Sequence, residues 1–162
     1  MRRVLGIAAG VFLVACGTDE AQGRVAFSQV EVQAYLEREA ARTLPGLAVS
    51  AATCPAQLPE TVGTTVTCTV VVAGVPLYYD VQRLVADRFE ARPARPVIVV
   101  SDVVAAVQAK LGAEATDVRC GDAAVAQPNP GQPLSCQVSG PGSSRTAAVR
   151  VDADGTLVVT DT

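Results

Sequence analysis

Four cysteines could bind a metal, form a redox-active pair or form structural disulfides, and their spacing helps to distinguish these possibilities. They form two couples, Cys54 with Cys68 and Cys120 with Cys136, and a similar length of chain separates the members of each couple. Zinc ligands normally come as close pairs such as Cys-x-x-Cys, and the sequence has no histidine, which disfavours a metal site. A redox-active pair is also disfavoured, because these spacings do not place two thiols together at a helix N-terminus. We therefore expect the disulfides Cys54–Cys68 and Cys120–Cys136, with no metal and no cofactor.

The fifth cysteine, Cys16, ends a short apolar leader. Two arginines precede the apolar or small residues 4–14, a run too short to span a bilayer as a stable helix. Residues 13–16, Leu-Val-Ala-Cys, resemble the lipobox of bacterial lipoprotein precursors. The resemblance implies cleavage between Ala15 and Cys16 and diacylation of the Cys16 thiol. An ordinary secretory signal followed by a chance cysteine is the alternative.

The leader sets the expected location of the chain. We expect residues 1–15 to be a lipoprotein signal peptide and residues 16–26 to be a lipidated tether. The protein would then be exported and held on the outer side of the bacterial cell membrane by lipid on Cys16. Disulfides persist in that compartment, which agrees with the four remaining cysteines.

The net charge argues against a nucleic-acid partner. Removal of residues 1–15 takes away two arginines, leaving 11 basic and 16 acidic side chains and a net charge of −5. The chain has one lysine and no basic cluster, so it lacks the electrostatic footprint of a nucleic-acid-binding protein. A second hydrophobic stretch long enough to cross a membrane is also absent from the sequence.

Residues for catalysis are scarce. Without histidine, hydrolysis by a Ser-His or Cys-His pair is excluded, and the sequence contains no Gly-x-Ser-x-Gly or Ser-x-x-Lys motif. The glycine-rich segment 140–144 lacks the following helix and lysine of a phosphate-binding loop, so it indicates a hairpin loop. We predict that the protein is not an enzyme.

The cysteine couples belong to an internal repeat. When the chain is aligned with itself so that Cys136 falls on Cys68, Gly131 falls on Gly63, and both copies read Gly-x-x-x-x-Cys. We therefore expect two modules of one kind, at residues 27–92 and 96–162. The segment from Arg92 to Pro96, with residues 93–95 as the linker proper, contains two prolines and should be extended.

Each predicted module opens with a helix. Ser28 and Glu31 have the spacing of a capping box, and the apolar residues that follow share one helical face. In the second module Ser101-Asp102 should cap a shorter helix that stops at Gly112. The charged residues of the first helix should form a solvated face; they are Glu37, Arg38, Glu39 and Arg42.

Alternating residues after each helix predict strands. Cys68, Val70 and Val72 share one parity, which should face inward, and the threonines 65, 67 and 69 share the other. Cys136 and Val138 repeat this pattern, and Ala73-Gly74 should form a hairpin turn. The predicted fold class is α+β: two tandem modules, each one helix packed on a four-stranded antiparallel sheet with one disulfide.

Two adjacent tyrosines should leave opposite faces of the first sheet. Tyr79 shares the parity of Leu77 and Val81 and should lie in the core, whereas Tyr78 falls on the polar face with Asp80. An aromatic ring on a polar sheet face is a candidate interface anchor. A lone surface tyrosine with no role is the alternative for Tyr78.

These features together resemble a known domain. A capped helix, Cys54-Pro55 after a strand, and Gly63 with Cys68 shortly after it resemble a small domain of unknown function in envelope lipoproteins of actinobacteria. That domain often lies behind a lipobox and sometimes occurs in tandem. The second module departs from the pattern, because Cys120-Gly121 stands in place of Cys-Pro. The resemblance implies a fold and a location but no activity.

Three functions are consistent with the sequence. The favoured one is a lipid-anchored binding or structural module that offers a sheet face or edge to an envelope protein or wall partner. An inhibitor or regulator of an envelope enzyme is the second, by analogy with tandem helix-plus-sheet inhibitors that carry one disulfide per module. A carrier of lipid or a small ligand is the third, although small cores of valine and alanine leave little room for a cavity.

Overall fold

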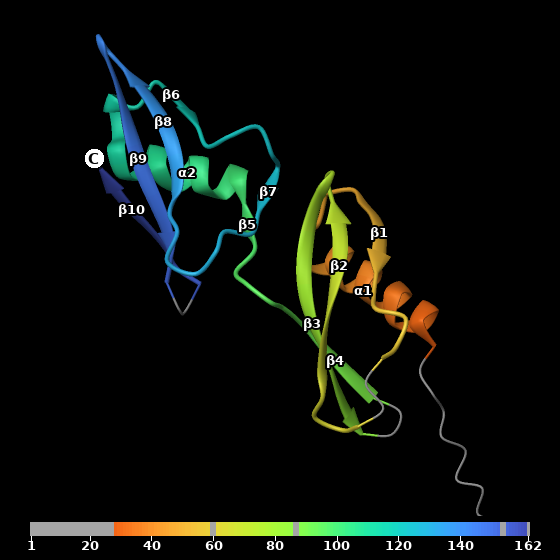
Figure 1. Ribbon diagram of the computed structural model, residues 1–162. Coiled ribbons are helices and arrows are strands. Elements are labelled where there is room, and N and C mark those ends of the chain that lie inside the picture. Colours follow the sequence, from red (N-terminus) through yellow and green to blue (C-terminus); the bar gives the residue numbers. More distant parts are fainter. Residues whose placement is uncertain (1–27, 59–60, 86–87, 153–154, 162) are drawn as a thin grey trace, which may run out of the picture.

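The fold combines helices with antiparallel sheets. The computed structural model describes residues 28–58, 61–85, 88–152 and 155–161, and the predicted signal peptide and tether lie outside these ranges. Figure 1 shows the elements in chain order. They are α1 (Gln29–Thr43), β1 (Val49–Thr53), β2 (Thr65–Val72), β3 (Val75–Val85), β4 (Arg88–Pro93), β5 (Ile98–Val99), α2 (Val100–Leu111), the 3₁₀ turn η1 (Gly112–Glu114), β6 (Asp117–Arg119), β7 (Val125–Ala126), β8 (Leu134–Gly140), β9 (Ser143–Val151) and β10 (Leu157–Asp161).

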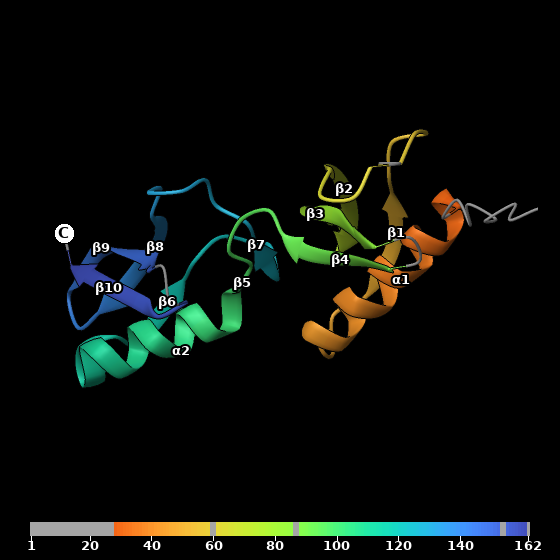
Figure 2. The same cartoon turned by 90° about the horizontal axis from the view of Figure 1, so that it is seen from below.

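Two four-stranded sheets and one two-stranded ribbon make up the strand content of the described residues. The first sheet has the order β1-β2-β3-β4, the second has the order β10-β9-β8-β6, and the ribbon pairs β5 with β7. All neighbouring strands are antiparallel. Figure 2 shows α1 and α2 on the same side of their sheets. The expectation of a mixed helix and antiparallel sheet fold is confirmed.

Helix α1 begins as its sequence predicts. The Ser28 hydroxyl accepts a hydrogen bond from the Glu31 N–H at 3.2 Å, and the Glu31 carboxylate accepts one from the Ser28 N–H at 3.0 Å. This capping box satisfies donors that the first helical turn leaves without partners. Val32, Leu36 and Ala40 then face the first sheet and are buried in its core.

Helix α2 begins differently from the prediction. It starts at Val100 and not after Ser101-Asp102, and its N-cap residue, Val99, makes no side-chain hydrogen bond. The Val100 N–H instead donates to the Ala124 carbonyl at 3.0 Å, next to β7. A backbone carbonyl thus satisfies one N–H donor of the first helical turn, which a capping side chain would otherwise satisfy. The helix ends at Gly112 as predicted, where a φ of +59° favours glycine.

The strands after each helix have the predicted parity. Cys68, Val70 and Val72 are buried, as are Cys136 and Val138 of the second sheet. Ala73 and Gly74 have φ values of +48° and +79°, the left-handed pair that a two-residue hairpin turn requires.

The ribbon was not predicted, and it lies between the two sheets (Figures 1 and 2). Val99 pairs with Val125, and both pack against the core of the first sheet. Ile98 pairs with Ala126, and both pack in the core of the second sheet. Because alternate strand residues point to opposite faces, each face of the ribbon belongs to a different core. We call residues 28–95 the N-terminal half and residues 96–161 the C-terminal half.

Candidate functional site

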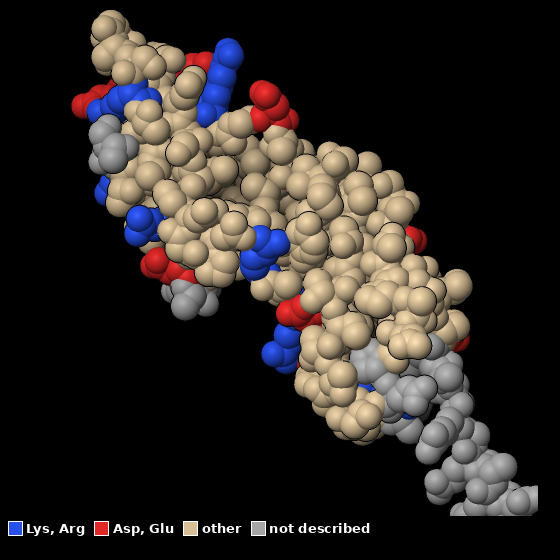
Figure 3. Space-filling model, in the orientation of Figure 1, with Lys and Arg blue, Asp and Glu red and all other residues tan. Residues whose placement is uncertain are grey.

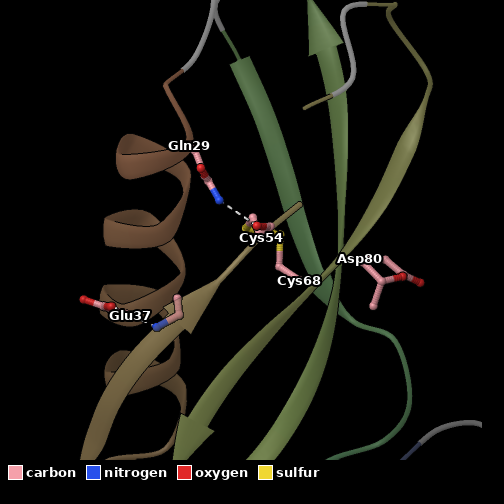
Figure 4. The surroundings of a disulfide bond; sticks show 7 residues. Gln29, Glu37, Cys54, Cys68 and Asp80 are labelled. Carbon is pink, nitrogen blue, oxygen red and sulfur yellow. Dashed lines mark hydrogen bonds between the residues drawn. A yellow bond between two sulfur atoms is a disulfide. The ribbon is translucent and has the colours of Figure 1, made fainter. Parts of the chain in front are cut away.

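The first disulfide anchors α1 to its sheet. Cys54 follows β1, Cys68 lies in the middle of β2, and the two form a bond that is buried on the helix side of the sheet. Figure 4 shows the Gln29 side chain reaching from the first turn of α1 to this disulfide, where its Nε2 donates to the Cys54 carbonyl at 2.7 Å. The disulfide joins the end of β1 to the centre of β2, and the Gln29 hydrogen bond attaches the start of α1 to the same point.

The second disulfide has the equivalent place in the C-terminal half. Cys120 follows β6 and Cys136 lies in β8, with both residues buried. Both predicted pairings are thus confirmed, and each ties the strand after a helix to the next long strand of the same sheet. Cys16, the predicted lipid attachment site, lies outside the described residues.

One residue of the expected solvated face of α1 has a structural contact instead. Glu37 accepts a hydrogen bond from the Ala52 N–H at 2.9 Å, on the edge strand β1. The interpretation of Glu37 as a solvated residue was therefore wrong: a charged acceptor satisfies a donor of β1. Glu39 and Arg42 do pair on the helix surface, and the hydrogen bond from Arg42 lowers the pKa of Glu39.

The two adjacent tyrosines leave opposite faces of β3, as predicted. Tyr79 is 2% exposed and lies in the core of the first sheet, whereas Tyr78 is 39% exposed. Burial raises the pKa of Tyr79, and the neighbouring Thr43 hydroxyl opposes that rise. We call the face of each four-stranded sheet that is turned away from its helix the outer face. Asp80, which shares the parity of Tyr78, points away from α1 in Figure 4.

Polar side chains surround Tyr78 on the outer face of the first sheet. The guanidinium of Arg95 lies over the Tyr78 ring, 4.9 Å from its centroid, in cation–π geometry. Thr67 donates to Asp80 across the β2–β3 pair at 2.8 Å. A shallow hollow of about 250 Å³ adjoins this pair and is lined by Thr65, Asp80, Gln82, Glu90, Arg92 and Pro93.

The outer face of the second sheet is also polar. On β8 and β9 its exposed residues are mostly hydroxyl and amide side chains, namely Ser135, Gln137, Ser139, Ser144 and Thr146, with Arg150 beside them. The ion pair of Asp117 and Arg119 on β6 and the exposed Val158 on β10 share this face. Figure 3 shows that most of the visible surface is uncharged, with acidic and basic residues scattered over it. The two outer faces therefore offer hydrogen-bonding groups and one aromatic ring without a strong charge of either sign.

The described residues contain neither a metal-binding cluster nor a helix that could span a membrane. Within those ranges, no group of three or more cysteine, histidine, aspartate or glutamate side chains lies close enough to hold a metal ion. None of the helices there is long and apolar enough to cross a membrane.

Sequence reasoning missed Gln127, a partner of Tyr78. The Gln127 side chain hydrogen bonds to the backbone of Tyr78, which is 49 residues away along the chain. Its neighbours Pro128 and Pro130 indicate a loop, and a glutamine in a loop carries no signal of a distant partner. Arg95, assigned to the linker by its prolines, was missed as a partner of Tyr78 for the same reason.

Comparison with known families finds a match over part of the chain. Residues 11–87 match the family model of a domain of unknown function, DUF4333. The match includes α1, the Cys54–Cys68 disulfide and Tyr78, and it ends before β4. No curated protein and no solved structure matches the chain.

Proposed function

We propose that this chain is a lipid-anchored protein of the bacterial envelope that binds a partner without catalysis. The diacylated residue is Cys16, and the anchor holds the protein at the outer side of the cell membrane. The leader before Cys16 and the lipobox-like residues 13–16 support the anchor. The chemistry of the two outer faces supports the binding role.

We further propose that the two halves are copies of one module. In each half a helix precedes a short strand that leads to a cysteine, and the second cysteine lies in the next strand of the same sheet. The sheets also share one strand order along the chain once the ribbon strands β5 and β7 are set aside. A duplication accounts for this agreement and for the Gly-x-x-x-x-Cys repeat in the sequence.

The observation that carries the binding role is the placement of the outer faces. Both helices lie on one side of the molecule, so the two outer faces look toward the other side (Figure 2). The Tyr78 ring gives this surface an aromatic group among hydroxyl, amide and carboxylate groups. Such a surface suits an envelope protein or wall partner that is recognised by hydrogen bonds around one apolar contact.

Replacing Cys16 by serine tests the anchor. We expect the variant to move largely from the membrane fraction to the soluble fraction of the envelope, because two acyl chains supply the membrane affinity that an acidic chain lacks. Both disulfides should still form, which a non-reducing peptide map would verify as a control for export. An equal share of wild type and variant in the membrane fraction would rule out the lipid anchor.

Capture of a partner tests the outer face. We expect Tyr78→Ala to reduce recovery of the crosslinked partner by about threefold or more, and Tyr78→Phe to retain it, since the ring makes the contact. The matched control is Val30→Ala, because Val30 is 71% exposed on α1, away from the outer face. Equal recovery with Tyr78→Ala and Val30→Ala would exclude Tyr78 as an anchor.

The nature of the captured material discriminates among the three functions. Wall material or a structural envelope protein supports the proposed binding module. One dominant enzyme whose activity falls on binding would make the protein an inhibitor, and co-purified lipid would make it a carrier.

A further inference from the structure

The ribbon joins two cores that the sequence predicts as separate. Val125, in β7 of the C-terminal half, is fully buried in the core cluster of the first sheet. Val97 and Val99 pack against the same cluster, while Ile98 and Val100 are buried in the cluster of the second sheet. Apolar packing therefore continues from one half to the other through residues 97–100 and 125–126.

Next to this packing, the Gln127 side chain takes the place of a strand residue. Strand β4 ends at Pro93, which pairs with Tyr79, and next to it the backbone donates to Tyr78 through the Ala94 N–H alone among the contacts of the described residues. The Tyr78 N–H donates to Gln127 Oε1 at 2.7 Å, and Gln127 Nε2 donates back to the Tyr78 carbonyl at 3.0 Å. A primary amide carries the same donor and acceptor as a peptide group, so it can extend the ladder by one further pairing.

Two further contacts fasten the linker at the same point. Gln127 Nε2 also donates to the Arg95 carbonyl at 3.0 Å, and the Ala94 N–H donates to the Tyr78 carbonyl at 2.9 Å. Arg95, with its guanidinium over the Tyr78 ring, donates to Asn129 Oδ1. Thus Tyr78 and Arg95 of the N-terminal half meet Gln127 and Asn129 of the C-terminal half in one hydrogen-bonded cluster.

We infer that residues 125–129 are a latch that docks on the open edge of β3 and holds the two halves as one rigid body. The docking site accepts an extended segment that has an apolar side chain and, two positions later, a glutamine. Here these residues are Val125 and Gln127. The apolar residue enters the core, and the amide pairs with the strand edge. A partner of the outer faces would then meet both sheets in a fixed relation. This inference does not depend on the proposed function.

The orientation of the halves tests the latch. Residual dipolar couplings of the chain carrying Cys16→Ser should fit a single alignment tensor for both halves. In Gln127→Ala the two halves should need separate tensors, and the protection factor of the Tyr78 amide against hydrogen exchange should fall about tenfold or more. The matched control is Gln137→Ala, because Gln137 is exposed on the outer face of β8. It should leave both measurements unchanged.

A charge-dependent variant separates the latch from general destabilisation. Gln127→Glu keeps the side-chain length but, when ionised at pH 7, replaces the donating amide with a second acceptor that faces two carbonyls. It should therefore behave like Gln127→Ala at pH 7 and recover much of the Tyr78 protection at about pH 3, where a carboxylic acid is protonated and donates again. Wild type measured at both pH values corrects for other titrating groups. If either the single tensor or the Tyr78 protection persists in both Gln127 variants at pH 7, the latch is refuted.

Discussion

Replacing Cys54 and Cys68 together by alanine is expected to lower the free energy of unfolding of the N-terminal half by about 3 kcal/mol. The bond closes a loop with a sequence separation of 14, and losing it frees that loop in the unfolded chain. The core around it consists largely of valine, alanine and leucine side chains, gathered from a short stretch of chain. So small a core leaves little reserve of stability, and the loss should therefore be a large share of the total.

Urea denaturation followed by amide chemical shifts of each half would measure this loss. The matched control is the double variant Cys120→Ala with Cys136→Ala, whose loop has a sequence separation of 16 and whose effect should be of similar size. Its primary effect should fall on the C-terminal half. An unchanged urea midpoint in either double variant would mean that its disulfide does not stabilise the fold by restricting the conformations of the unfolded chain.

Local sequence patterns predicted the elements whose stability arises locally. The capping box at Ser28 and Glu31 needs only two positions within one helical turn, so it could be predicted directly. The inward parity of Cys68 and Cys136 follows from strand alternation, and it places each disulfide in its core. The contrast between Tyr78 and Tyr79 follows from the same alternation.

The elements that were missed depend on distant partners. The strands of the β5–β7 ribbon, Ile98–Val99 and Val125–Ala126, are too short to show a periodic pattern. Ser101-Asp102 is a good cap in isolation, but the Ala124 carbonyl accepts the Val100 N–H and lets the helix start earlier. Glu37 and Gln127 are polar residues whose roles depend on which backbone donor or acceptor the fold brings to them. Tertiary contacts of this kind cannot be predicted from the helix or strand propensities of the neighbouring residues.

These missed contacts change how the candidate site is understood. The sequence predicts Tyr78 as a ring on a polar sheet face, either an interface anchor or a lone surface tyrosine, but gives no sign of its partners. In the structure its backbone pairs with Gln127 and its ring lies under Arg95. The backbone contacts hold the strand edge, while the ring remains 39% exposed. A role in holding the halves and a role in binding are therefore separable at this one residue: the first uses its peptide groups and the second its side chain.

Truncating Tyr79 to alanine is expected to destabilise the N-terminal half by about 2–4 kcal/mol, in the range for large buried side chains. The ring lies within the core cluster that contains Leu77 and, from the other half, Val125. Tyr78→Ala is the matched control on the neighbouring residue and should cost less than about 1 kcal/mol, because a half-exposed ring leaves no sealed cavity. Thermal and urea melts would give both values, and the reverse order would contradict the placement of the two rings.

The Tyr79 hydroxyl adds a dependence on pH whose sign can be predicted. Burial raises the pKa of Tyr79 in the folded protein, so the unfolded chain ionises first as the pH rises past about 10. The stability that comes from keeping this phenol neutral is complete below that pH and is lost as the pH rises toward the folded pKa. Tyr79→Phe keeps the ring in the core and should therefore change the stability at neutral pH by less than about 1.5 kcal/mol. It should then lose less stability than the wild type between about pH 9 and pH 11, because it has no phenol at this position to ionise on unfolding. Equal losses for the two proteins over that interval would mean that the Tyr79 phenol is as free to ionise in the fold as in the unfolded chain.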